Sequence, residues 1–179
     1  PLEKGSIKSY DKMMNVLYSP EERAKLEWAI GAIIAGDSKN IQKFIVLYGE
    51  AGTGKTVLSS IIQDIVDPTT HNVLAIPDNR EDMGVALSCH YLLTVDNISE
   101  LSKGTSDLLC QASTGGSVIS RTKFTNFEAS IVSFKNCVIL NGITVENAKP
   151  DLLDRTIKLE MEQLTGTYDS VEEILDSFR

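Results

Sequence analysis

One eight-residue segment constrains the fold of this chain more than any other. Residues 49–56 read Gly-Glu-Ala-Gly-Thr-Gly-Lys-Thr, which has the pattern G-x-x-x-x-G-K-[ST]. The apolar run Phe44–Tyr48 before it is typical of a buried strand, and Val57–Val66 after it has helical periodicity. This context suits a phosphate-binding loop, in which glycines let backbone N–H groups turn inward at a helix N-terminus. We therefore predict a P-loop at this position.

The side chains of the loop predict which ligands it binds. Lys55 supplies a positive charge for the β- and γ-phosphates, and the hydroxyl of Thr56 can bind Mg²⁺. The expected cofactors are therefore ATP and Mg²⁺, and a glycine-rich turn without a ligand is the alternative. The residues expected to bind the nucleotide are Gly49, Glu50, Ala51, Gly52, Thr53, Gly54, Lys55 and Thr56.

A carboxylate follows another apolar run and is the expected second magnesium contact. The run Leu92–Val95 ends at Asp96, and α/β sheets bind ligands at the carboxyl ends of their strands. Asn97 follows where many ATPases have a glutamate, and an asparagine can orient water but cannot take its proton. A base must then come from elsewhere. Glu50 and Glu100 are the candidates, although each is also explained as a solvated acid.

Strands and helices alternate along the chain, which predicts an α/β fold. We expect a P-loop NTPase with a five-stranded parallel sheet flanked by helices, and a β-hairpin insertion between residues 117 and 133. The expected strands are 44–48, 73–76, 91–95, 137–140 and 156–161. The expected regions are an N-terminal lead-in and helix over 1–40, the P-loop core over 41–163, and the start of a C-terminal helix or truncated lid over 164–179. A helix is expected to begin at Ser19 and Pro20, with Trp28 in the core.

Composition excludes several classes of function. The 179 residues carry a formal net charge of -8, so a broad nucleic-acid footprint is excluded but a small basic patch is not. No apolar run approaches the roughly 20 residues of a membrane helix, so no membrane partner is expected. The three cysteines are widely spaced, which favours a reducing cytoplasm over a disulfide framework.

The order of these parts resembles the superfamily 3 helicases, within the AAA+ class of P-loop ATPases, and especially the ATPase domains of phage and plasmid primase-helicases. The resemblance implies an AAA+-like fold, a hexameric homo-oligomeric ring and a role in DNA replication, in the bacterial host cytoplasm if the protein is phage-encoded. The start at Pro1 without Met favours an excised fragment, and the further partners expected from the resemblance are other replication proteins or an N-terminal primase domain missing from that fragment. Four blocks carry it: residues 49–56, 92–97, 114–124 and 138–141.

The third block is the most specific, because a glycine pair is followed by basic and aromatic residues. In the family such a hairpin lines the ring's pore and grips single-stranded DNA. Arg121 and Lys123 lie two residues apart beside Phe124, which suits phosphate contacts and base stacking. Lys135 can add to this patch, and Arg121 can instead reach a phosphate across a subunit interface. The alternative is a solvated hairpin with Phe124 in the core.

Two further residues take roles from the resemblance. Asn141 resembles the polar sensor residue that orients water, and the alternative is an Asn-Gly turn. Arg155 resembles an arginine finger that reaches a neighbouring subunit's nucleotide. The alternative for Arg155 is a surface ion pair with Asp151 or Asp154.

The leading hypothesis is therefore an ATP-hydrolysing DNA helicase motor from a phage or mobile-element replication protein. An AAA+ loader or remodeller that uses ATP as a switch is the first alternative, and Asn97 favours it somewhat. A small P-loop kinase is less favoured, because the chain has no clustered lid arginines. A nucleotide-binding scaffold without hydrolysis is the last alternative.

Overall fold

The structure is a computed structural model that describes residues 11, 14, 19–36, 41–67, 75, 77, 79–98, 101–121, 129–142 and 150–162. Its centre is a parallel sheet in the order β2-β5-β1-β6. The four strands are β1 (Phe44–Tyr48), β2 (Leu92–Ile98), β5 (Cys137–Gly142) and β6 (Thr156–Glu160). The sequence predicts a fifth strand at 73–76, where only Ala75 is described, outside any strand. The described sheet thus has four of the five expected strands.

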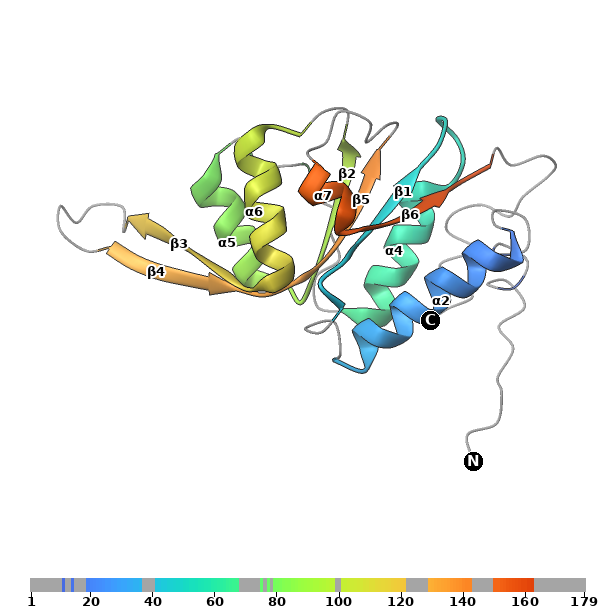
Figure 1. Ribbon diagram of the computed structural model, residues 1–179, viewed down its shortest axis with the longest axis horizontal. Helices are drawn as coiled ribbons and strands as arrows, with labels where there is room; N and C mark the ends of the chain where they lie inside the picture. Colours follow the sequence, from blue (N-terminus) through green and yellow to red (C-terminus); the bar gives the residue numbers. More distant parts are fainter. Residues whose placement is uncertain are drawn as a thin grey trace.

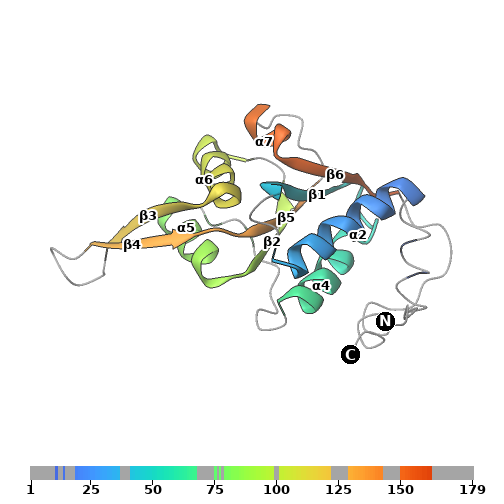
Figure 2. The ribbon, with the colours of Figure 1, turned by 60° about the horizontal axis from the view of Figure 1, so that its bottom comes forward.

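Helices cover both faces of this sheet (Figures 1 and 2). Side chains alternate along β1, so that Ile45 and Leu47 pack in one apolar cluster and Phe44 and Val46 in another. The first cluster includes residues of α2 (Pro20–Ile34) and α4 (Lys55–Val66). The second includes residues of α5 (Arg80–Cys89), α6 (Lys103–Thr114) and α7 (Pro150–Asp154). Burial on both faces explains why β1 and the first four residues of β5 are apolar.

Helix α2 begins where the sequence predicts, but its tryptophan is not in the core. Ser19 Oγ accepts a hydrogen bond from the Glu22 backbone N–H at 3.3 Å, and Pro20 opens the helix. Trp28 is 60% exposed, so the prediction that it is buried is wrong. It lies about 200° around the helix from the buried Leu26. The buried stripe is instead formed by Leu26, Ala29, Ile30 and Ile33.

Trp28 lies in a groove of about 680 Å³ between α2 and β6. The groove borders the first residues of β6, and β6 is an edge strand in the described part of the chain. Lys43 and Lys158 also line it, and lysines beside a sheet edge disfavour pairing with a foreign strand. Lys43 precedes β1, and Lys158 is the middle residue of β6.

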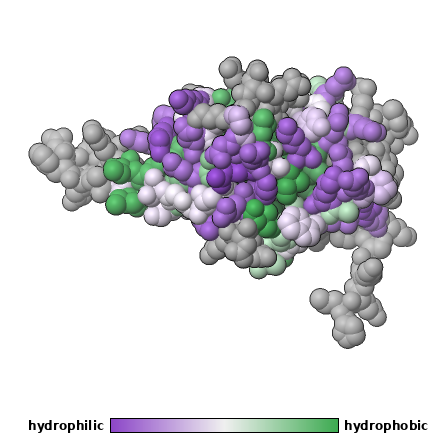
Figure 3. Space-filling model, in the orientation of Figure 1, coloured by the Kyte–Doolittle hydropathy of each residue, from purple (hydrophilic) through white to green (hydrophobic). Residues whose placement is uncertain are grey.

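The predicted hairpin is confirmed and forms a separate antiparallel pair of strands, β3 (Gly116–Arg121) and β4 (Ala129–Phe134). Figure 1 shows it projecting away from the sheet. Val118 and Phe134 are buried among residues of α5 and α6. Ile119 and Ile131 pair directly and are 65% and 73% exposed, and Figure 3 shows an apolar patch over the part of the molecule that the hairpin forms. The hairpin therefore has one packed face and one open face.

Two sequence expectations fall on parts of the chain that are not described. The hairpin tip, residues 122–128, and the expected C-terminal helix over 170–178 lie outside the described residues. None of the helices that the structure does describe is long and apolar enough to cross a membrane.

Close packing of β2 against β5 predicts the effect of one substitution. A Cβ atom on Gly142 would lie 2.5 Å from the backbone oxygen of Ile98, which cannot rotate away. Gly142→Ala should lower the free energy of unfolding by about 1–3 kcal/mol in urea denaturation. Gly31→Ala is the control, because open space surrounds Gly31 in α2, and it should raise stability by about 0.5–1 kcal/mol. Equal midpoints for the two variants would contradict this packing.

Candidate functional site

The loop over 49–56 connects the end of β1 to the start of α4, as the sequence predicts. Gly52 and Gly54 have φ angles of 80° and 82°, which favour glycine over residues with side chains. Gly49 has a φ of 146°, and a Cβ there would lie 2.5 Å from the Met161 backbone oxygen. Glu50 and Ala51 are exposed. The glycine pattern is thus required by the backbone path and by a close contact.

Lys55 lies over the loop and not in the core. Its Nζ donates hydrogen bonds to the backbone oxygens of Gly49 at 2.8 Å and Glu50 at 2.6 Å. Thr53 is fully buried and donates to the same Glu50 oxygen at 3.0 Å. Burial lowers the pKa of Lys55, and the negative charge of Asp96 opposes that shift. Burial thus disfavours the charged form of Lys55, and an anion bound at the loop would stabilise that form.

The two predicted magnesium ligands meet in the structure. Thr56 Oγ1 donates a hydrogen bond to Asp96 Oδ2 at 2.9 Å, although 40 residues separate them. Asp96 lies where the β2–β5 register shifts between Val95 and Ile98, and such irregularities re-aim side chains. No cluster of three or more His, Cys, Asp or Glu occurs among the described residues. A hydroxyl and one carboxylate fit Mg²⁺, which binds few protein ligands together with water and phosphates.

Asn141 joins this group from β5. The pairing of β5 with β1 places it opposite Leu47, two residues before the loop. It lies within a strand, so the alternative of an Asn-Gly turn is wrong. Its Nδ2 donates to Ser59 Oγ of α4 at 2.8 Å, and its buried Oδ1 has no partner among the described residues. Asn97 belongs to β2, but its side chain lies outside the description, as does Glu100.

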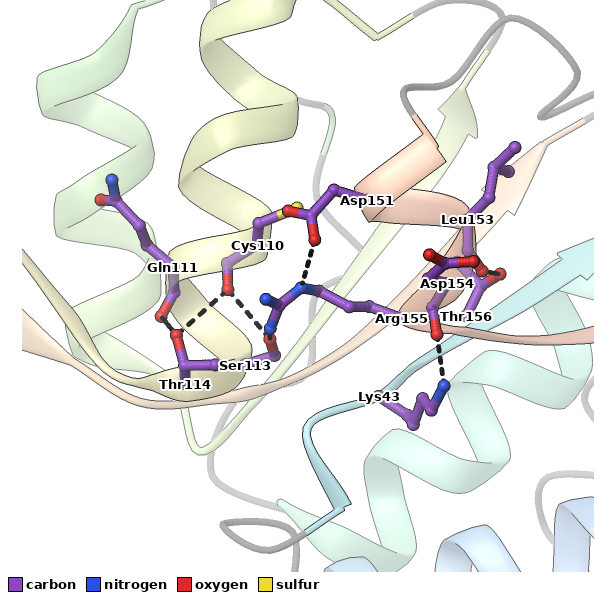
Figure 4. A network of polar contacts seen from close by, with 10 residues as sticks. All are labelled: Lys43, Cys110, Gln111, Ser113, Thr114, Asp151, Leu153, Asp154, Arg155 and Thr156. Atoms are coloured by element: carbon purple, nitrogen blue, oxygen red, sulfur yellow. Dashed lines mark hydrogen bonds and ion pairs between the residues drawn. The ribbon is translucent and has the colours of Figure 1, made fainter.

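Arg155 lies at the other end of the sheet, and Figure 4 shows it with its partners Asp151 and Ser113. The backbone N–H of Phe44 donates to the Arg155 oxygen at 2.7 Å, so Arg155 is beside the start of β1. The loop follows the end of β1, roughly 13 Å further along at 3.3 Å per residue. The structure thus brings Lys55, Thr56, Asp96 and Asn141 together and leaves Arg155 apart from them.

The guanidinium of Arg155 has partners within the chain. Its Nε donates to Asp151 Oδ1 at 3.2 Å, and its Nη1 donates to Ser113 Oγ at 3.3 Å. The surface pair with Asp151 that the sequence allows is therefore present. Cys110 lies beside Asp151, and burial together with that carboxylate raises the pKa of its thiol to about 11. The thiol is consequently protonated near neutral pH.

The predicted DNA contacts are placed only in part. Arg121 ends β3 opposite Ala129, but its side chain lies outside the description, as do Lys123 and Phe124. Lys135 follows β4 at the base of the hairpin, next to Gly115. It is therefore at the opposite end of the hairpin from Arg121.

Sequence reasoning missed two partners of predicted residues, Ser59 and Ser113. For Ser59 the sequence does contain a signal. A serine on the apolar face of the helix that follows the loop needs a polar partner. Ser113 contacts Arg155 across 42 residues, and no local pattern marks it.

Comparisons with known proteins agree with this architecture. The family model described as "Actinomycete integrative conjugative element replication protein" matches residues 7–174. No curated protein sequence matches the chain. Two apo structures of the NrS-1 C-terminal region align at TM-scores of 0.64 and 0.65, with 16% and 18% identity, over 99% of this chain. A structure of JCV helicase with a bound small molecule aligns over 88% at a TM-score of 0.50 and 15% identity.

The chain spans 45%, 44% and 46% of the lengths of those three structures. At these identities the likeness is one of fold, an α/β fold with a parallel sheet flanked by helices.

Proposed function

Because the chain belongs to the family of actinomycete integrative conjugative element replication proteins, we propose that it is the ATP-hydrolysing motor domain of a DNA helicase. It acts as a ring on single-stranded DNA, in the cytoplasm of a bacterial host. The hydrogen bond between Thr56 and Asp96 carries this proposal, because it joins the loop to the strand-end carboxylate that a magnesium site needs.

ATP and Mg²⁺ fit the residues present. The backbone N–H groups of residues 49–56 suit the phosphates, Lys55 adds the positive charge, and Thr56 with Asp96 suits the metal. The bound nucleotide supplies the phosphoryl group, and the metal supplies charge stabilisation. Asn141 orients water from β5. Asn97 has the same capacity, since an amide can orient water but cannot take its proton. Glu50 and Glu100 remain the candidates for the base.

The position of Arg155 supports a ring. It lies at the amino end of β1, whereas the loop lies at the carboxyl end, so it cannot serve the site of its own chain. A guanidinium that acts on a nucleotide from this position must therefore act on that of a neighbouring subunit. We therefore propose a homo-oligomer, a hexamer by resemblance, in which each Arg155 completes the next site.

The hairpin is the proposed DNA contact. It projects from the body of the molecule, which suits an element that lines a pore (Figure 2). A chain with a net charge of -8 needs focused cations to bind DNA, and Arg121 and Lys123 are the proposed pair. Phe124 is the proposed stacking residue.

One sequence feature favours a second candidate function. Asn97 in place of a glutamate favours a loader that uses ATP as a switch and does not unwind DNA. Hydrolysis measured with and without single-stranded DNA, together with unwinding of a forked duplex, separates the two. DNA-stimulated hydrolysis with strand separation supports the motor, and slow hydrolysis without separation supports the switch.

The loop assignment predicts the behaviour of Lys55→Ala. This variant should lose ATP–Mg²⁺ binding and turnover but keep the wild-type melting temperature, because Nζ contacts only oxygens of the loop and Lys55 belongs to neither apolar cluster. Lys25→Ala is the matched control, since it removes the same charge from an exposed pair with Glu21. Titration calorimetry and phosphate release are the measurements. Wild-type turnover in folded Lys55→Ala would remove the assignment.

The ring proposal predicts complementation between subunits. Arg155→Ala should bind ATP normally but turn over more slowly, on the order of 10³-fold, because a finger acts on charge that develops in the transition state. Mixing it with Lys55→Ala should restore part of the activity, since some interfaces then pair an intact loop with an intact arginine. Mixed rings without recovered activity would count against a finger acting between subunits.

The hairpin proposal predicts loss of DNA binding in Lys123→Ala/Phe124→Ala with ATP binding retained. Each lost phosphate contact should reduce the log–log salt slope by about 0.7. Loss of a stacked base should cost roughly 1–3 kcal/mol. Lys135→Ala is the control, because it removes the same charge at the hairpin base. The measurement is fluorescence anisotropy with a labelled oligonucleotide across a salt series, and wild-type affinity in the folded double variant would overturn the assignment.

A further inference from the structure

The side-chain amide of Asn141 is fully buried yet makes only half of its contacts within the described residues. Its Nδ2 is 2.8 Å from Ser59 Oγ, whereas its Oδ1 has no hydrogen-bond partner there. A buried oxygen without a donor is unfavourable, so a polar partner outside the described residues is expected at this atom. The position of Asn141 opposite Leu47, next to the loop, makes a ligand or water of that site the partner.

Ser59 decides which end of this amide is free. Ser59 Oγ lies 3.0 Å from the backbone oxygen of Lys55 and 3.0 Å from that of Thr56. These carbonyl oxygens only accept, so the single hydroxyl proton of Ser59 points to one of them. Ser59 Oγ then accepts from Asn141 Nδ2, and Oδ1 is the end of the amide without a partner among the described residues.

We propose that Ser59 is a positioning residue that holds the Oδ1 of Asn141 toward the reacting water. This inference rests on the proposed ATPase function. Oδ1 is an acceptor, and a phosphate oxygen is also an acceptor, so the two cannot bond to each other. A water molecule can donate to Oδ1, and Asn141 therefore orients water and does not hold the phosphate. The same hydroxyl fixes this orientation relative to Lys55 and Thr56.

Ser60 provides a matched control on the same helix. Its Oγ donates to the Thr56 oxygen at 2.8 Å, the same kind of bond within the helix. That is the only hydrogen bond of its side chain that the described residues show, and it does not involve Asn141. Ser59→Ala and Ser60→Ala thus both remove a hydroxyl bonded to a helix carbonyl, and only the first removes the contact with Asn141.

Steady-state kinetics and ATP binding test the proposal in the full chain. Ser59→Ala should lower kcat roughly tenfold and leave the Kd for ATP–Mg²⁺ within about twofold, since water orientation matters in the transition state. Ser60→Ala should behave as wild type, and thermal melts check that both variants fold. The Ser59→Ala/Asn141→Ala double variant should be no slower than Asn141→Ala alone, because Ser59 acts through Asn141. Equal kcat values for the two serine variants, or multiplied defects in the double variant, would overturn the proposal.

A second measurement does not depend on turnover. In ¹⁵N-labelled protein, the side-chain amide pair of Asn141 is the one that disappears in Asn141→Ala. Its protons should exchange slowly in wild type and Ser60→Ala, and rapidly in Ser59→Ala. If the wild-type protein hydrolyses no ATP, the proposed function fails, while this exchange still decides the Ser59–Asn141 orientation. Slow exchange that persists in Ser59→Ala would overturn the inference.

Discussion

The parallel pairing of β1 with β5 is the contact on which the rest of the structure depends. It is buried on both faces, and it sets the end of β5 beside the start of the loop. Parallel strands share a carboxyl edge, so β1 delivers the glycine loop, β2 delivers Asp96 and β5 delivers Asn141 to one place. Apolar burial, which carries no chemical specificity of its own, thus assembles polar groups far apart in the sequence.

The same parallel order of the strands keeps Arg155 away from the loop over residues 49–56. Arg155 precedes β6 and is therefore held at the amino edge of the sheet. Its ion pair with Asp151 joins side chains that are 27% and 64% exposed, and such pairs are worth about 0–1 kcal/mol. Exchanging that partner for another acceptor costs little free energy. The backbone hydrogen bond between Arg155 and Phe44 thus fixes the position of Arg155 more than its ion pair with Asp151 does.

The sequence predicts those parts of the site whose constraints are local. The glycine loop is specified by backbone angles, Asp96 by the end of an apolar run, and the hairpin by alternation. Trp28 was wrongly predicted because apolar character outweighed its angular position on the helix. Ser59 could not be linked to Asn141, because 82 residues separate them and only the packing of α4 on the sheet brings them together. Such contacts follow from tertiary packing, which no short window contains.

The hairpin is joined to the sheet by very little chain. Only Lys135 and Asn136 separate β4 from β5, the strand that ends at Asn141 and Gly142. The backbone N–H of Asn136 donates to the Ala112 oxygen at 3.1 Å, and its side chain bonds the His90 oxygen. A Cβ on Gly84 of α5 would lie 2.2 Å from Val118 of β3, so the hairpin rests tightly on that helix. Asn136 is thus a pinned point of the backbone between β4 and β5, two strands of six residues each. A force applied to β4 therefore reaches β5, the strand that carries Asn141, through two residues of covalent backbone.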